Sequence, residues 1–248
     1  MTQHDETLTE TQIRIDLAAA IRLSCRNEWH EGVANHFSAA VSADGKKFLV
    51  NPRWVHWSRV RASDLILCDA DDPSTMDRPD APDPSAWSIH SALHRNLPQA
   101  RVALHIHPPH ATALCCLQDP TIYPVDQVTA RFYKRMAYDM AFGGIASEGE
   151  EGERIAKTVG NHRNVMMQNH GVTTLGNTVA EAWDALYHLE RAARILVTAY
   201  QTGQELAVMP DELAEATAAE WETYRDAEFA HFAEMKRILD KEEPDYKE

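Results

Sequence analysis

Apolar and polar residues recur along the chain with two different periods, which together predict a mixture of helices and strands. Apolar residues at helical spacing predict helices over residues 9–29, 87–97, 109–117 and 148–161, a long helix that follows Thr178, and a last helix over 210–239. Shorter runs of apolar and β-branched residues predict strands over 35–41, 47–50, 65–68, 101–107, 165–168 and 172–175. Helices and strands are therefore expected to alternate through most of the chain.

Residues 69–84 interrupt this pattern. The stretch holds four prolines and six aspartates, namely Pro73, Pro79, Pro82, Pro84, Asp69, Asp71, Asp72, Asp77, Asp80 and Asp83. We expect no helix at that proline density, and a loop of this length is usually functional or mobile. The aspartates lack the spacing of an EF-hand, so we favour a solvated loop over a calcium site.

Three histidines stand at the ends of predicted strands. His105 and His107 close the apolar run 101–107, and residues two apart in a strand point to the same face. Two imidazoles on one buried face cost desolvation unless they share a ligand, and a divalent metal is the natural one. His170 follows a second apolar run, 164–168. Three ligands of this kind would leave an open coordination position, which is typical of a catalytic metal site.

Other histidines and charged residues leave alternatives open. A His-x-His pair by itself also occurs on strand surfaces without a metal. His90 shares a helix face with Ala86 and could be a general base, a hydrogen-bond donor behind the metal ligands, or a structural residue. Arg131 could hold a substrate carboxylate, since arginine matches that anion with two parallel hydrogen bonds, or could lie on the surface.

Composition narrows the class of protein. The 248 residues are enough for one sizeable core, and no run of eighteen apolar residues predicts a membrane span. The formal net charge of −14 argues against nucleic acid or an anionic membrane as a partner. The polar, acidic N-terminus is unlike a secretory signal, and four cysteines show no disulfide-type spacing, so a reducing cytoplasm is expected.

Several segments together resemble the class II aldolase/adducin family. They are GVANHFS (32–38), FLVNP (48–52), ASDL (62–65), SIHSALH (88–94), HIHP (105–108) and NHGV (169–172). The resemblance covers residues 13–204, so we expect a family domain over 1–205 and an acidic helical extension over 206–248. It implies a three-layer α/β/α fold with a mostly antiparallel sheet, a homotetramer, and a divalent metal, most often zinc with manganese or iron as alternatives, on His105, His107 and His170.

The resemblance also implies a substrate site, with departures from the pattern of the family's aldolases. The glutamate that serves those enzymes as base corresponds to Ala86, and their tyrosine acid, which reaches across a subunit interface, falls near Asp126 or Gln127. The segments that grip substrate correspond to Asn35, His36, Ser38 and Ser85, with His36 in place of an asparagine. This pattern is nearer to the adducin-like branch, which includes decarboxylases.

These observations predict a metal-dependent carbon–carbon lyase, either a decarboxylase or an aldolase. Its substrate would be a small oxygenated carboxylate or carbonyl compound. His90 and Asp126 are the candidate catalytic residues in the absence of a glutamate at Ala86. Decarboxylation needs an electron sink but no proton abstraction from carbon, so it tolerates Ala86 better than aldol cleavage does. The alternative is a non-catalytic, adducin-like assembly module.

Overall fold

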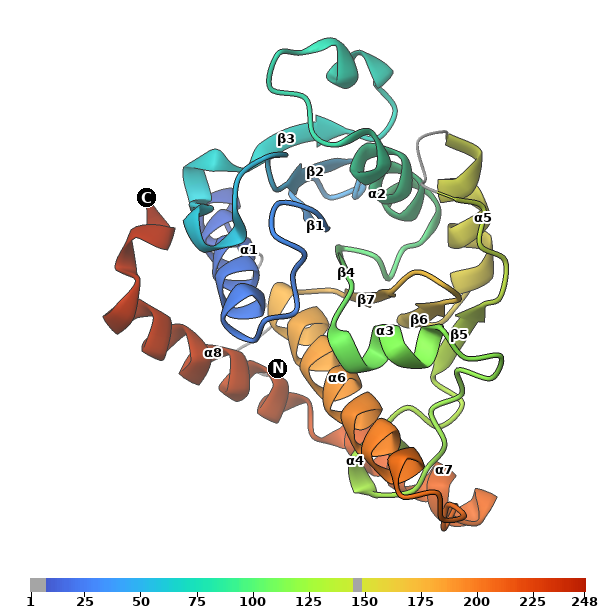
Figure 1. Cartoon of the computed structure of the whole chain (residues 1–248). Helices are drawn as coiled ribbons and strands as arrows, with labels where there is room; N and C mark the ends of the chain where they lie inside the picture. Colours follow the sequence, from blue (N-terminus) through green and yellow to red (C-terminus); the bar gives the residue numbers. More distant parts are fainter. Residues whose placement is uncertain (1–7, 145–148) are drawn as a thin grey trace.

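A seven-stranded sheet forms the middle layer of the residues that the computed structural model describes, 8–144 and 149–248 (Figure 1). Its strands are β1 (His36–Ala40), β2 (Lys47–Val50), β3 (Ile66–Asp69), β4 (Val102–Ile106), β5 (Met136–Asp139), β6 (Asn164–Met167) and β7 (Val172–Gly176). Their order across the sheet is β3-β2-β1-β4-β7-β6-β5. Every neighbouring pair is antiparallel except β5 and β6, which confirms the prediction of a mostly antiparallel sheet.

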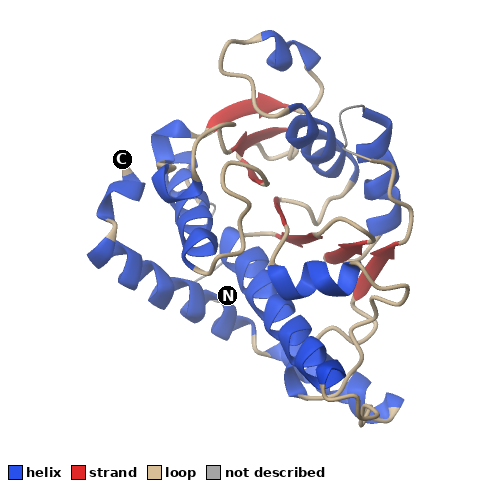
Figure 2. Cartoon of the chain, in the orientation of Figure 1, coloured by secondary structure: helices blue, strands red, loops and turns tan. Residues whose placement is uncertain are grey.

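Helices cover both faces of this sheet, as the colouring by secondary structure shows (Figure 2). On one face, α2 (Pro84–Asn96) and α5 (Gly149–Val159) pack against β4, β5, β6 and β7. On the other face lie α1 (Glu10–Arg26), α3 (Pro109–Cys115) and α6 (Val179–Gln201). The short helices and turns are α4 (Gln127–Ala130), η1 (Trp57–Arg59), η2 (Ala62–Asp64), η3 (Pro73–Asp77) and η4 (Pro244–Lys247). The predicted three-layer α/β/α architecture is confirmed.

The alternation of side chains along β1 and β4 brings histidines together under α2. Phe37 and Leu104 point into the core that α1 and α6 share. Because successive strand residues face opposite sides, His36 and His105 point the other way. The antiparallel register pairs these two residues directly, and their ring centroids are 4.7 Å apart. The fold therefore places this patch of imidazoles between the sheet and α2.

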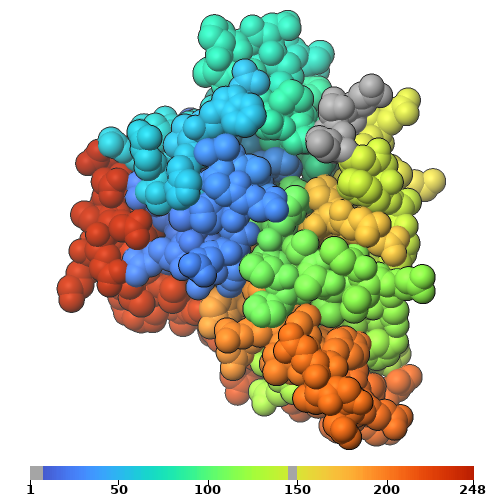
Figure 3. All heavy atoms as spheres, viewed as in Figure 1, coloured from blue at the N-terminus to red at the C-terminus, as the bar shows by residue number. Residues whose placement is uncertain are grey.

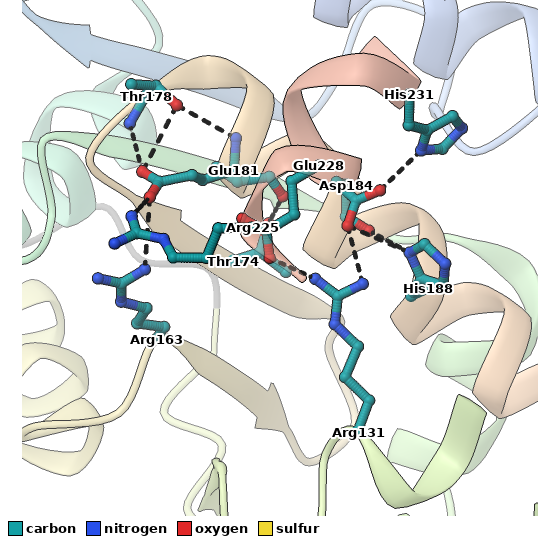
Figure 4. A network of polar contacts seen from close by, with 11 residues as sticks. Arg131, Arg163, Thr174, Thr178, Glu181, Asp184, His188, Arg225, Glu228 and His231 are labelled. Carbon is teal, nitrogen blue, oxygen red and sulfur yellow. Dashed lines mark hydrogen bonds and ion pairs between the residues drawn. The ribbon is translucent and has the colours of Figure 1, made fainter. Parts of the chain in front are cut away.

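The C-terminal segment packs as an outer layer on the rest of the molecule. It forms α7 (Asp211–Thr223) and α8 (Arg225–Glu242), and α8 lies along the surface beside the N-terminal helix (Figure 3). Phe232 and Leu239 of α8 are buried in the main core. An ion-pair network that includes Arg131, Asp184 and Glu228 also joins α8 to α6 (Figure 4). The extension predicted over 206–248 thus shares its core with the family domain.

Several predicted boundaries need correction. The single helix expected over 210–239 is two helices, because the chain leaves helical geometry at Tyr224 (φ −92°, ψ 30°). The stretch 69–84, predicted to be without helix, contains the 3-10 helix η3, in which Pro73 occupies the first turn, where no backbone N–H is needed. Helix α2 starts at Pro84 rather than at Trp87, since Asp83 caps it by accepting from the Ser85 amide.

The predicted start of α5 at Glu148 lies outside the described residues. Strand β5 and helix α4 fall within 125–139 and were not predicted, because that stretch shows no clear period. Within the described part of the chain, no helix combines the length and the apolar character needed to cross a bilayer.

Candidate metal and substrate site

Three histidine side chains converge at one end of the central strands. His105 is on β4, His107 directly follows that strand, and His170 stands in the turn between β6 and β7. One nitrogen from each lies within 4.8 Å of the others, and the Nε2 atoms of His105 and His107 are 3.3 Å apart. The structure thus brings together the three residues predicted as metal ligands.

Hydrogen bonds behind two of these rings determine which nitrogen carries the proton. His105 Nδ1 lies 3.1 Å from the Val172 carbonyl oxygen, and His107 Nδ1 lies 2.6 Å from a carboxylate oxygen of Glu31. Both partners can only accept, so each ring donates from Nδ1. In the metal-binding form each ring keeps a lone pair on Nε2, and these two nitrogens face each other across 3.3 Å. A shared cation would satisfy both lone pairs.

The donor set fits a divalent metal. Ligand nitrogens about 2.0–2.1 Å from a tetrahedral zinc lie about 3.3–3.4 Å apart, which matches the His105–His107 spacing. Burial lowers the pKa of His105 well below its usual value and, with the charge of His107, that of His170 to about 4. Both imidazoles are therefore neutral at pH 7, which is the form that binds metal.

The turn that carries His170 is built around two backbone constraints. Asn169 has φ +55°, a left-handed conformation that asparagine tolerates better than most residues. Gly171 lies so close to the site that a Cβ there would be 2.2 Å from Cδ2 of His107 and 2.7 Å from the Ile106 carbonyl oxygen. Only glycine fits against the His107 ring, so close packing requires the glycine of the NHG sequence.

The histidine cluster forms part of the wall of a cavity of about 570 Å³. Of the residues predicted to bind substrate, Asn35, His36 and Ser85 line it, together with Ala86. The wall also holds residues that were not predicted from the sequence, namely Glu31, Asn51, Arg53, Trp54 and Phe142. Among the described residues that line the cavity, Arg53 alone carries a permanently charged cationic side chain, and no periodic pattern in the sequence singles it out.

A buried chain of hydrogen bonds runs from this wall into the interior. His36 Nδ1 is 2.8 Å from His90 Nε2, and His90 Nδ1 is 2.5 Å from Ser38 Oγ. The same hydroxyl is 2.8 Å from His94 Nε2. Burial lowers the pKa of His36 and of His94 to about 3, so these rings are neutral.

This series of hydrogen bonds shows where two predicted site residues lie, His90 and Ser38. His90 and Ser38 are fully buried and lie behind the cavity wall, where they fix the orientation of His36. His90, predicted to be catalytic, therefore does not line the cavity but hydrogen-bonds to His36, which does.

The structure does not bring Asp126 or Arg131 to this cavity. Asp126 caps α4 by accepting from the Thr129 amide at 2.8 Å. Arg131 is held between Asp184 and Glu228 at 2.8 and 2.9 Å, so its guanidinium already has two carboxylate partners (Figure 4). A role for Asp126 across a subunit boundary stays a prediction.

Comparison with known proteins was consistent with this geometry. The family model described as "Class II Aldolase and Adducin N-terminal domain" matches residues 15–197. A Caulobacter vibrioides protein that carries the name of a class 2 aldolase is 31% identical over 206 residues, which are 83% of this chain and 79% of that protein. The crystal structure of an aldolase II superfamily protein from Pseudomonas syringae superposes with a TM-score of 0.87 at 28% identity and covers 98% of both chains.

A relative with a different named activity also matches. The Streptomyces niveus protein named decarboxylase NovR is 27% identical over 154 residues, which are 62% of this chain and 57% of that protein.

Proposed function

The chain belongs to the class II aldolase and adducin family, and we propose that it is a metal-dependent carbon–carbon lyase. Its substrate would be a small oxygenated carboxylate or carbonyl compound. The observation that carries the proposal is the approach of the Nε2 atoms of His105 and His107 to 3.3 Å on a cavity wall, with His170 completing the cluster.

We assign the metal to His105, His107 and His170, with zinc as the preferred ion. When bound, a divalent ion there supplies Lewis acidity, which contributes several kcal/mol by drawing charge from a substrate oxygen. Val172 and Glu31 hold two of the ligand rings in the required tautomer, a support that typically changes metal affinity by about 10–100-fold.

Decarboxylation is the preferred reaction because of Ala86. This side chain lines the cavity and has no group that accepts a proton, so it cannot abstract one from a substrate carbon. In a decarboxylation the bond from carbon to carboxylate breaks, carbon dioxide leaves, and the electron pair stays on the remaining fragment until a proton is added. The name of the S. niveus relative agrees with this preference.

Arg53 is our candidate for holding the substrate carboxylate in place of Arg131. Its guanidinium is exposed at the cavity and matches a carboxylate with two hydrogen bonds. His36 would present its neutral Nε2 to the substrate, since His90 occupies its Nδ1. Aldol cleavage remains the second reaction, with Asp126 of a neighbouring subunit as acid in a homotetramer.

The deciding experiment compares two readouts on the purified protein. Candidate hydroxy and oxo acids are screened for carbon dioxide release, and candidate aldol products for exchange of carbon-bound hydrogen with deuterated solvent. We expect carbon dioxide release, and we expect Ala86→Glu to inhibit it, because a carboxylate would fill the open position beside the metal. Ala86→Ser serves as the matched control that keeps the space. Rapid exchange with no carbon dioxide from any acid would overturn the preference for decarboxylation.

Metal content separates the enzyme from a non-catalytic adducin-like module. Elemental analysis of the enzyme should show about one divalent ion per three-histidine site. A protein purified with no ion on these residues, and unable to take one up, would favour the module.

A further inference from the structure

A second group of metal-ligand side chains lies at the C-terminal end of α1. Cys25 is in the last turn of that helix, His30 is in the loop that follows, and His56 precedes η1. One donor atom from each lies within 4.8 Å of the others. Cys25 Sγ is 3.5 Å from His30 Nε2, which is 3.3 Å from His56 Nε2.

The backbone brings these residues together through a specific helix end. Glu28 has φ +59°, the Trp29 amide donates to the Ser24 carbonyl and the Glu28 amide donates to the Cys25 carbonyl. This pair of hydrogen bonds around a left-handed residue turns the chain back along the helix. This reversal of the chain brings the side chain of His30 beside that of Cys25.

The donor spacings match those of a tetrahedral metal site. With Zn–S of about 2.3 Å and Zn–N of about 2.0–2.1 Å, a tetrahedral ion separates sulfur from nitrogen by about 3.6 Å and two nitrogens by about 3.3–3.4 Å. The observed separations at Cys25, His30 and His56 are 3.5 and 3.3 Å. The sulfur–nitrogen and the nitrogen–nitrogen separations therefore both agree with those expected around zinc.

Ordinary hydrogen bonding satisfies this group poorly. His30 Nε2 is in contact with both the thiol and the other ring, but one ring nitrogen has either a single proton or a single lone pair. It therefore cannot bond fully to both neighbours. The other ring nitrogen of His30 is buried and has no hydrogen-bond partner among the described residues.

His56 turns Nε2 toward the cluster and Nδ1 toward Ser58. Its Nδ1 accepts from the Ser58 amide at 3.2 Å and lies 2.8 Å from Ser58 Oγ. Metal binding through Nε2 would use the other tautomer, in which Nδ1 donates to the Ser58 hydroxyl and gives up the longer amide contact. His30 stacks on Trp57, with ring centroids 6.1 Å apart, while His56 is exposed and leaves the site open to solvent.

We propose that Cys25, His30 and His56 form a second metal site, for a divalent ion of borderline softness such as zinc, with water in the fourth position. A thiolate together with two imidazoles is a donor set that suits zinc and is chemically distinct from the three imidazoles of the cavity. The ion would tie the end of α1 to η1. The site does not depend on the proposed lyase activity.

Cobalt(II) binding to the full chain tests the site. After metal removal and with the thiols kept reduced, cobalt titration should give a near-ultraviolet sulfur-to-cobalt charge-transfer band. Only this site can produce that band if the cavity binds through imidazoles alone. Equilibrium dialysis should show about two ions per chain, and about one in Cys25→Ser and His56→Ala.

Matched variants decide the outcome. Cys116→Ser changes an exposed cysteine away from the cluster and should keep the band, and His107→Ala should keep it while losing the cavity ion. His56→Ala changes an exposed residue, so it tests the site even if Cys25→Ser fails to fold. The absence of a charge-transfer band in the native chain, or its persistence in folded Cys25→Ser, would overturn the proposal.

Discussion

The three-histidine cavity and the Arg131–Asp184 network are both polar clusters inside the molecule, but they differ in how their groups are satisfied. In the network, the buried Asp184 accepts from Arg131 at 2.8 Å and from His231 at 2.7 Å, and His188 lies 3.3 Å away (Figure 4). Glu228 accepts a hydrogen bond from the other terminal nitrogen of Arg131 at 2.9 Å. In the cavity, one nitrogen of each of the three histidines faces the other two, and the carboxylate of Glu31 lies behind His107, on its other nitrogen.

The two regions contain cavities of similar volume. The space beside Arg131 and Glu228 is about 530 Å³, close to the 570 Å³ of the histidine cavity. What differs is the pairing of groups: ion pairs between carboxylates and cations join the helices of the network, whereas the histidine nitrogens of the cavity converge on one another. We therefore expect the first region to contribute to stability and the second to binding. Three changes can break or sharpen this distinction.

The largest effect is expected from His170→Ala. Removing one of three ligands should abolish occupancy of the cavity site, from about one ion per three-histidine cluster to almost none. Metal content after dialysis, compared with His188→Ala as the matched control in the network, is the measurement. Full retention of the cavity ion in His170→Ala, located by anomalous scattering, would show that the cluster is not the metal site.

Asp184→Asn should lower the stability of the protein and leave its metal content unchanged. The change leaves Arg131 and two histidines around a neutral side chain in a buried position, and loss of one partner of a buried ion pair costs about 3–5 kcal/mol. The urea midpoint should fall accordingly, while the metal content of the folded protein stays unchanged. Loss of metal with unchanged stability would contradict the assignment of this network to structure.

The sequence predicts the histidines of the cavity better than the network, for a physical reason. His105 is on β4 and His107 directly follows this strand, so the strand period predicts that both lie on one face. The partners of Arg131 are 53 and 97 positions away, and no local period connects them. The predicted substrate role of Arg131 therefore gave way to a structural one, while Arg53, which lacks any local signal, was missed.

The same distinction holds for the fold. Strands and helices with a strong local period, such as β4 and α6, were predicted within a few residues. Strand β5 pairs in parallel with β6, a contact across more than twenty residues, and the stretch before it mixes charged and aromatic side chains. Helix formers continue on both sides of Tyr224, so the local sequence does not signal the break there.

The smallest predicted effect concerns the pH dependence of stability at Glu228. Burial raises the pKa of this carboxyl to about 7, because the lowering by the Arg131 charge is smaller than the effect of burial and repulsion from Asp184 raises the pKa further. Burial by itself would also raise the pKa of Asp184. Hydrogen bonds from His188 and His231 and the charge of Arg131 outweigh burial and hold this pKa far below its usual range. One arginine thus serves two carboxylates, of which Glu228 is the one that protonates readily.

A raised pKa means that the folded state binds the proton more tightly than the unfolded state. The stability contributed by protonated Glu228 is fully present below its unfolded pKa of about 4.5 and is lost as the pH rises through about 7. After allowance for solvent screening of a partly exposed group, we expect a loss of about 1–2 kcal/mol between pH 5 and pH 8. Glu228→Gln mimics the protonated form and should remove this component.

Urea unfolding of the native chain and Glu228→Gln at both pH values measures the difference. The variant should match the native chain near pH 5 and exceed it in stability near pH 8, without any change in cavity metal. Equal pH dependence in the two proteins would mean that Arg131 neutralises both carboxylates. The network would then be as fully paired as its geometry allows, and its contrast with the histidine cavity would be greater still.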